Sequence, residues 1–196
     1  MKSVVLGTHN PDKLAELKKL LKGSGIKVLS LSDFPQCPEA RETGRTFEAN
    51  ARIKARAYSC HAKTLALADD SGLMVSALGG RPGVYSARFA GPGCTYRDNN
   101  RKVLRLLKSK KSRRAKFISS MALYSNGRPV AIAKGECRGK IAKDEKGTYG
   151  FGYDPIFVPQ GFTKTFAQLT PKTKNQISHR AKALHAIRPF ILKFWK

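Results

Sequence analysis

The chain has 196 residues, 41% of them hydrophobic, and its 38 Lys and Arg against 13 Asp and Glu give a formal net charge of +25. This length and apolar content allow a packed core and exclude a disordered chain. The apolar run at the N-terminus is too short for a signal peptide, and no later run is long enough to span a bilayer, so we expect a cytoplasmic protein. The four cysteines are widely spaced without a CxxC pair, which is typical of reduced thiols and not of a disulfide framework or zinc site.

The excess of basic residues has three interpretations. We rank a solvated basic surface first, electrostatic steering of a small polyanion second and nucleic-acid binding third. The order reflects the spread of basic residues along the whole chain, whose densest run is Lys108 to Arg114. It also reflects the lack of a known nucleic-acid module pattern.

The first third of the chain predicts alternating strands and helices. Apolar periodicity and turn residues indicate a strand, a helix, a second strand, a second helix and a third strand, over residues 3–7, 11–22, 26–31, 47–61 and 65–69. Pro11 fits the first turn of the first helix, Gly23 ends that helix, and Thr46 can cap the second.

The rest of the chain adds an antiparallel feature to this pattern. Here we expect a strand, a helix, two strands, a short strand and a C-terminal helix, over residues 73–78, 96–108, 117–124, 130–137, 156–158 and from about 172. Asn126-Gly127 predicts a hairpin, and Pro189 should break or kink the last helix. The mixture predicts a single α/β domain over residues 1–196, built around a mixed sheet.

Two adjacent carboxylates, Asp69 and Asp70, follow the apolar run 65–68 and precede Ser71-Gly72. We interpret them as acids at the end of a strand, where open α/β sheets place their ligands. Because Mg²⁺ needs only a few carboxylates besides water and phosphate, Glu42 and the pair Asp69-Asp70 are candidate ligands, and two acids from these separate segments would suffice. The alternatives are an ordinary loop carboxylate for Glu42 and a turn cap for Asp69.

Three further segments are candidates for binding a substrate. Residues 8–13 join a strand to a helix, a junction whose amides favour anions, although a simple helix cap with a solvated Lys13 explains them as well. Residues 147–155 combine glycines with aromatic rings that stack on a base or fill a core. His179 and Arg180, with Lys174 nearby, indicate a polyanion contact, or a structural His.

Taken in order, these segments resemble the inosine/xanthosine triphosphate pyrophosphatase family, the Ham1-like enzymes. The resemblance rests on six segments in the right order and spacing, residues 8–13, 42–47, 68–72, 78–89, 151–155 and 178–180. It implies an elongated α/β fold of two lobes with a cleft between them, and a homodimer. It also implies Mg²⁺-dependent hydrolysis of ITP, dITP or XTP to the monophosphate and pyrophosphate. A Maf-like pyrophosphatase of different base preference and a basic nucleic-acid-binding protein that reuses the fold are the alternatives.

The resemblance also implies a role for each candidate residue. Glu42 and Asp70 would hold Mg²⁺, and Asp70 would be the catalytic residue that accepts a proton from the attacking water. The residues expected to bind the triphosphate are Thr8, His9, Asn10, Pro11, Asp12 and Lys13. Those expected to contact the rest of the substrate and its 6-keto base are Ser71, Phe151, Gly152, Tyr153, Asp154, Lys174, His179 and Arg180.

The chain departs from the family pattern at Ala49, where many relatives carry Glu. On a helix that Glu would lie one turn from Arg45, whereas Glu48 points about 100° away and is a poor substitute. Two interpretations stay open: this lineage does without the acid, or the residue was changed to disable the enzyme.

Overall fold

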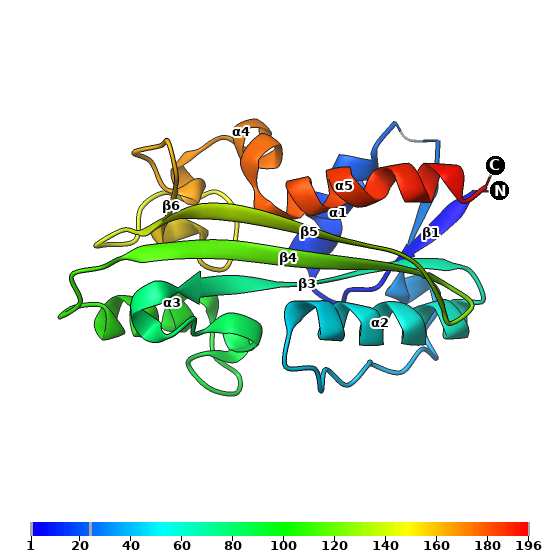
Figure 1. Ribbon diagram of the computed structural model, residues 1–196, viewed down its shortest axis with the longest axis horizontal. Helices are drawn as coiled ribbons and strands as arrows, with labels where there is room; N and C mark the ends of the chain where they lie inside the picture. Colours follow the sequence, from blue (N-terminus) through cyan, green and yellow to red (C-terminus); the bar gives the residue numbers. More distant parts are fainter. Residues whose placement is uncertain (1, 24, 196) are drawn as a thin grey trace. The chain divides into compact units, whose positions relative to one another are not determined.

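The computed structural model describes residues 2–23 and 25–195, which form an α/β fold around a six-stranded mixed sheet (Figure 1). The sheet order is β2-β1-β3-β4-β5-β6. Its strands are β1 Ser3–Leu6, β2 Lys27–Ser30, β3 Leu65–Val75, β4 Arg114–Ser125, β5 Arg128–Ile141 and β6 Phe157–Pro159. The α-helices are α1 Pro11–Leu21, α2 Phe47–Ala62, α3 Tyr96–Leu106, α4 Pro171–Ile177 and α5 His179–Lys193. The α/β class and the mixed sheet with flanking helices are confirmed.

The chain divides into two compact units, and β3, β4 and β5 contribute residues to both. Unit 1 consists of Met1–Asp70, Ser119–Gly135 and Arg180–Lys196. Unit 2 consists of Ser71–Ile118 and Glu136–His179. Each unit buries its own hydrophobic cluster.

In unit 1, helices cover both faces of the sheet: α1 and α5 lie on one side and α2 on the other (Figure 1). Successive residues of a strand point to opposite faces, so the sequence of β3 divides between the two layers. Leu65 and Leu67 pack with α1 and α5, whereas Ala66 and Ala68 pack on the side of α2. This alternation fixes where the next two residues of β3 point.

In unit 2, the core gathers around aromatic rings. Phe117 packs against Phe157 at a centroid distance of 4.7 Å and near Phe166 at 6.2 Å. All three rings are buried together with Val103 of α3 and Leu107, the residue that directly follows this helix. The 3-10 turns Gly83–Arg88 (η3) and Asp154–Ile156 (η4) connect the strands and helices of this unit.

Most of the expected elements are present close to their expected bounds. Asn10 caps α1 by accepting hydrogen bonds from two backbone amides, and Thr46 caps α2 by accepting from the amide of Ala49. Asn126 and Gly127 adopt positive φ angles of 46° and 78°, which a tight hairpin of this kind requires. Over the described ranges, the structure contains no helix long and apolar enough to cross a membrane.

Two expectations were wrong. The strand over residues 65–69 does not end at Asp69, and no separate strand covers 73–78: a single strand, β3, runs from Leu65 to Val75. Ser71-Gly72 is a local turn signal, but neighbouring β4 is 12 residues long and pairs with β3, which keeps the buried backbone extended.

The C-terminal helix is interrupted at Ser178 and not at Pro189. Ser178 has an extended conformation and ends α4, whereas Pro189 lies inside α5. The lost hydrogen bond at Pro189 is tolerated because Ile187 and Ile191, on either side of it, are fully buried in the core of unit 1.

Candidate active site

Asp69 and Asp70 are neighbours in sequence but belong to opposite faces of β3. Strand β1 ends at Leu6, which pairs with Leu67, so both acids lie just beyond the carboxyl end of the adjacent parallel strand. Asp69 continues the row of Leu65 and Leu67 toward α1 and α5, and Asp70 continues the row of Ala66 and Ala68 toward α2. The two carboxylates therefore serve different sites.

Asp69 holds two cations in place. One of its oxygens lies 3.4 Å from Nζ of Lys13 and 3.4 Å from Nε of Arg180. The guanidinium of Arg180 also pairs with Glu16, and Arg180 is 2% exposed. Burial lowers the pKa of Lys13 despite the opposing effect of Asp69. Asp69 thus acts as a buried counter-ion that fixes Lys13 and Arg180.

Asp70 faces a polar group on α2. Nδ2 of Asn50 donates to one oxygen of Asp70 at 3.1 Å, and Nζ of Lys54 lies 3.5 Å from the other. The same ammonium lies 2.8 Å from Oε1 of Glu42, so Lys54 bridges the two carboxylates. Burial raises the pKa of Asp70, and Glu42 raises it further, whereas Lys54 and Lys13 act against the rise.

The position of Lys54 tests whether Glu42 and Asp70 fit a divalent cation. Both carboxylates lie within 3.5 Å of one positively charged nitrogen, so the pair already shares a cation. Within residues 2–23 and 25–195, no group of three His, Cys, Asp or Glu side chains forms a metal site. Two carboxylates that converge on one positive charge are a donor set compatible with a hard divalent cation, which takes one or two carboxylates and completes its coordination with water and phosphate.

The residues between β1 and α1 form a helix N-terminus with a polar turn. Oδ1 of Asn10 accepts from the amides of Asp12 and Lys13 at 3.0 and 3.1 Å, and Oγ1 of Thr8 accepts from the amide of Asn10 at 3.2 Å. The simple cap is thus present. The sequence alone also allowed a solvated Lys13, but the structure does not show one. The Lys13 side chain is only 16% exposed, and its ammonium pairs with Asp69.

In unit 2, an aromatic ring and a buried ion pair meet. Nζ of Lys174 lies 2.6 Å from Oδ2 of Asp154 and 4.9 Å from the ring centre of Phe151. The same Asp154 oxygen accepts from the amide of Phe151 at 2.9 Å. Tyr153 is buried and its hydroxyl donates to the carbonyl of Ser86 at 2.8 Å. Together these contacts fix the Phe151 ring and the Lys174 ammonium beside each other.

The other three unit 2 candidates lie in different surroundings. The carbonyl of Gly152 accepts from Nδ2 of Asn100 at 3.1 Å. His179 is 4% exposed and stacks on Phe117, with ring centres 4.6 Å apart and planes 8° apart. Ser71 is half-buried on β3. Of the residues expected to bind substrate or metal, the structure places residues 8–13, Glu42, Asp70 and Arg180 in unit 1 and the remainder in unit 2.

Sequence reasoning missed Asn50, Lys54 and Glu16. The first two carried a signal: at positions i and i+4 they interrupt the small apolar face of α2 that includes Ala51 and Ala55, and both are buried. A buried lysine implies a partner, because its charge is costly without one. Glu16 carried no such signal, since it reads as an ordinary solvent-facing acid.

The model of the Ham1 family matches residues 4–190, so the chain belongs to the Ham1 family. It is 48% identical over 186 residues to a dITP/XTP pyrophosphatase of Geobacillus kaustophilus, covering 94% of this chain and 91% of that protein. It is 46% identical over 186 residues to a dITP/XTP pyrophosphatase of Bacillus subtilis, covering 94% of each.

Solved structures agree with this assignment. A HAM1 protein from Coxiella burnetii superposes with a TM-score of 0.89 at 41% identity, over 96% of this chain and 98% of that one. A nucleoside-triphosphatase, dITP/XTP pyrophosphatase, from Mycobacterium abscessus gives a TM-score of 0.77 at 42% identity, over 95% and 99%. The resemblance seen in the sequence is thereby confirmed.

Proposed function

We propose that this chain is a dITP/XTP pyrophosphatase, which hydrolyses the triphosphate to a monophosphate and pyrophosphate and so clears non-canonical purines from the nucleotide pool. The observation that carries the proposal is its similarity, over nearly the full length of both chains, to relatives of that activity. The family assignment favours this function over a Maf-like activity. ITP belongs to the same proposed substrate class.

We propose that Glu42 and Asp70 hold a divalent metal, Mg²⁺. When bound, the metal supplies positive charge to the phosphates and lowers the pKa of a coordinated water. Asp70 is also proposed to accept the water's proton, since its carboxylate would adjoin a water held by the same metal. Asn50 donates to the same carboxylate at 3.1 Å and fixes its orientation.

The turn between β1 and α1 is proposed to bind the triphosphate. The N-terminus of α1 and the Lys13 ammonium both favour negative charge at this place. Asp69 keeps Lys13 in position, since the two groups lie 3.4 Å apart. Positive charge fixed in advance stabilises the charge that develops on the leaving pyrophosphate.

The Phe151–Lys174 pair is proposed to recognise the base. The Phe151 ring offers a stacking face, and an ammonium has donors but no acceptor. Lys174 therefore matches a 6-keto oxygen and leaves a 6-amino group unpaired, at a cost of roughly 1–3 kcal/mol. Gly152, Tyr153, Asp154 and His179 are proposed to shape the same pocket, and Ser71 and Arg180 to contact substrate.

The proposal is tested by measuring pyrophosphate release from dITP, XTP, ITP, dATP, dGTP and a set of modified pyrimidine triphosphates, with Mg²⁺ and with EDTA. We expect rapid Mg²⁺-dependent release from the first three alone, in equal amount with the monophosphate. Equal turnover of every purine triphosphate, or a preference for the modified pyrimidines, would overturn it. The proposed homodimer is checked by molar mass in solution.

A further inference from the structure

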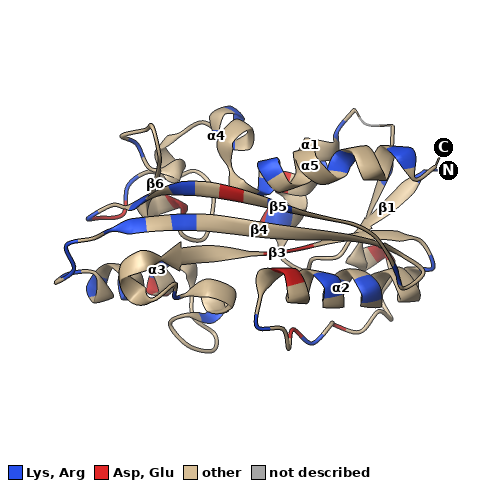
Figure 2. Ribbon diagram, in the orientation of Figure 1, with Lys and Arg blue, Asp and Glu red and all other residues tan. Residues whose placement is uncertain are grey.

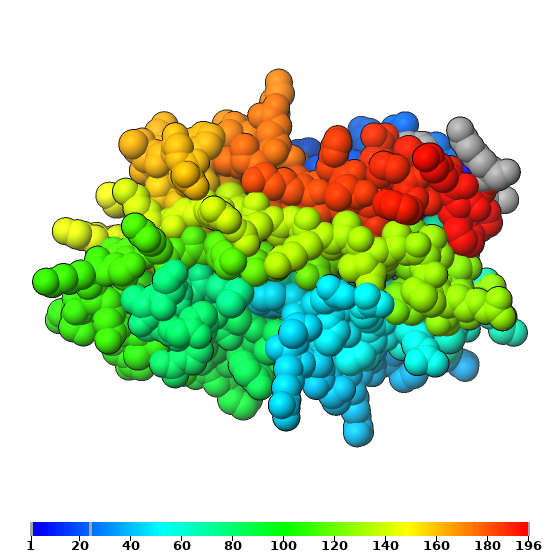
Figure 3. All heavy atoms as spheres, viewed as in Figure 1, coloured from blue at the N-terminus to red at the C-terminus, as the bar shows by residue number. Residues whose placement is uncertain are grey.

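Basic residues are concentrated in the first segment of unit 2. Residues 71–118 contain twelve Lys and Arg residues and a single acid, Asp98. Figure 2 shows basic residues on α3 and on the connection that follows it. The surface of α3 lies open in the space-filling view, in green around residue 100 (Figure 3). A surface with this excess of positive charge is a candidate for binding a polyanion larger than the small substrate.

On α3, three arginines form one row. Arg97, Arg101 and Arg105 are all exposed and follow each other at intervals of four residues, about 6 Å along the helix. Like charges at this spacing destabilise a helix by roughly 0.2–0.5 kcal/mol per pair, so folding does not favour the row. Asp98 does not neutralise it alone, because its carboxylate also caps the helix by accepting from the amide and hydroxyl of Thr95.

A depression lies beside this row. Its volume is about 450 Å³, and its lining residues are Ala90, Cys94, Asp98, Arg101, Lys102 and Arg105. Two side chains of α3 fix the loop that forms its edge: Asn99 binds the backbone of Ala87 and Ala90, and Lys102 donates to the carbonyl of Phe89 at 2.6 Å. The cations therefore border a hollow of defined shape and not a mobile loop.

Two exposed aromatic rings belong to the same unit as these cations. Tyr85 on η3 is 60% exposed, with the guanidinium of Arg88 5.5 Å from its ring centre. Tyr96 in the first turn of α3 is 42% exposed, but its ring centre lies 6.1 Å from that of Phe151, so Tyr96 is left out of the surface proposed below. Proteins that bind single-stranded nucleic acid combine a positive track for the phosphates with aromatic rings for unstacked bases. An anionic membrane would instead need an apolar anchor among the cations.

We propose that the surface formed by Arg97, Arg101 and Arg105 with Tyr85 binds single-stranded nucleic acid without sequence preference. The arginines contact successive phosphates, and the tyrosine ring stacks on a base. This binding is separate from the proposed hydrolysis, since it uses none of the residues assigned to the metal, the triphosphate or the base. From the sequence alone, nucleic-acid binding ranked last among the three interpretations of the basic charge. The proposal places it first for this surface.

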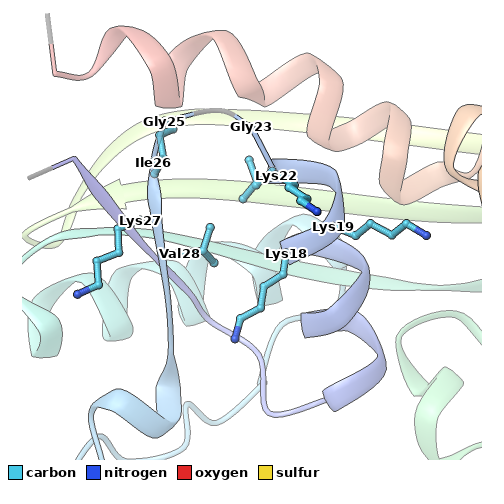
Figure 4. A pocket seen from close by; sticks show the side chains of 9 residues that line it. Lys18, Lys19, Lys22, Gly23, Gly25, Ile26, Lys27 and Val28 are labelled. Atoms are coloured by element: carbon cyan, nitrogen blue, oxygen red, sulfur yellow. The ribbon is translucent and has the colours of Figure 1, made fainter.

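A second basic pocket provides the matched control. In unit 1, a cavity of about 850 Å³ between α1 and β2 is bordered by Lys18, Lys19, Lys22 and Lys27. Figure 4 shows that Lys19 and Lys27 point away from each other, so the four lysines do not all lie in one row. Removing three of them changes the net charge as much as removing the α3 row does.

The test measures binding of labelled oligo(dT) of about 20 nucleotides by fluorescence anisotropy, between about 50 and 200 mM KCl. The variants are Arg97→Gln/Arg101→Gln/Arg105→Gln and the control Lys18→Gln/Lys19→Gln/Lys22→Gln. We expect the α3 variant to bind roughly tenfold more weakly and its log–log salt slope to fall by about 2, which corresponds to three lost phosphate contacts. The control variant should keep most of its affinity for the oligonucleotide. Tyr85→Ala should weaken binding without changing the salt slope. All of these variants should hydrolyse dITP at the wild-type rate.

Equal losses in both triple variants would show that binding follows net charge and would overturn the proposal. So would a wild-type protein that releases the oligonucleotide at physiological salt. The third measurement is binding to vesicles of anionic lipid. If the protein binds these vesicles as strongly as the oligonucleotide, and the arginine variant loses that binding, the surface is a membrane-binding surface instead.

Discussion

The two groups of candidate site residues are held in place by different forces. In unit 1, Asp69, Asp70, Lys13, Lys54 and Arg180 form a network of buried charges in which each cation contacts a carboxylate. In unit 2, a single ion pair, Lys174–Asp154, lies beside the ring of Phe151. Charge networks suit phosphate and metal, and a ring beside a fixed donor suits a planar base.

This difference predicts different consequences when each group is changed. Removing the charge of Asp70 in unit 1 alters the chemistry, while Lys54 retains Glu42 as an ion-pair partner. Removing one charge of the Lys174–Asp154 pair in unit 2 leaves the other buried without a counter-ion. The free energy of unfolding should therefore fall together with the selectivity for the base. The variants below separate these effects, beginning with the largest.

The strongest expected effect is that of Asp70→Asn on catalysis. The amide keeps the size of the side chain but cannot accept the proton of the attacking water, so we expect kcat for dITP to fall roughly 10²–10⁴-fold. The thermal midpoint should change little, because Lys54 keeps Glu42 as a partner. Asp144→Asn, which removes an exposed acid after β5, is the control. Undiminished kcat would remove Asp70 from the proposed mechanism.

The next effect concerns the buried pair in unit 2. Lys174→Met leaves Asp154, which is 2% exposed, without its ion-pair partner, and should destabilise the fold by about 3–5 kcal/mol in urea unfolding. The double variant Lys174→Met/Asp154→Asn should regain much of that stability. Both should lose the preference in kcat/KM for dITP over dATP. If the double variant also recovers the preference for dITP over dATP, the Lys174–Asp154 pair has a structural role only.

A smaller effect is expected at the start of α2. Thr46 caps this helix, and Ala49 occupies the third helical position, where Glu or Gln completes a capping box. Ala49→Glu and Ala49→Gln should both stabilise the protein, by roughly 0.5–1 kcal/mol. If Glu also contributes to the metal site, only Ala49→Glu should lower the Mg²⁺ requirement, by about tenfold. Equal Mg²⁺ dependence in all three proteins would show that a Glu at this position acts as a cap alone.

The weakest effect is a pH dependence in unit 2. Helix α3 has a complete capping box, in which hydrogen bonds from the side chain and amide of Thr95 hold the pKa of Asp98 below its ordinary value. A depressed pKa stabilises the folded state above the ordinary pKa of about 4, and this contribution disappears as the pH falls through the folded-state pKa. Thermal midpoints recorded from about pH 6 down to pH 2 should therefore fall less steeply for Asp98→Asn than for the wild type. If the thermal midpoints of the two proteins fall in parallel, the Asp98 cap is not the cause of the pH dependence.

Local sequence determined most of the elements and the family of this protein. Asn10, Thr46 and Asn126-Gly127 act within a few residues of themselves, so their caps and turn follow from sequence. Residue type and order likewise marked Glu42, Asp70 and Lys174 as candidate site residues. The roles given to these residues remain proposals.

Tertiary structure alone decided how the two aspartates differ. The sequence places Asp69 and Asp70 side by side before a turn signal, but pairing with neighbouring strands keeps β3 extended to Val75. An extended strand sends consecutive side chains to opposite faces, so Asp69 meets Lys13 and Arg180 while Asp70 meets Lys54. Arg180 lies 111 residues from Asp69 along the chain, and no local pattern encodes a contact over that distance.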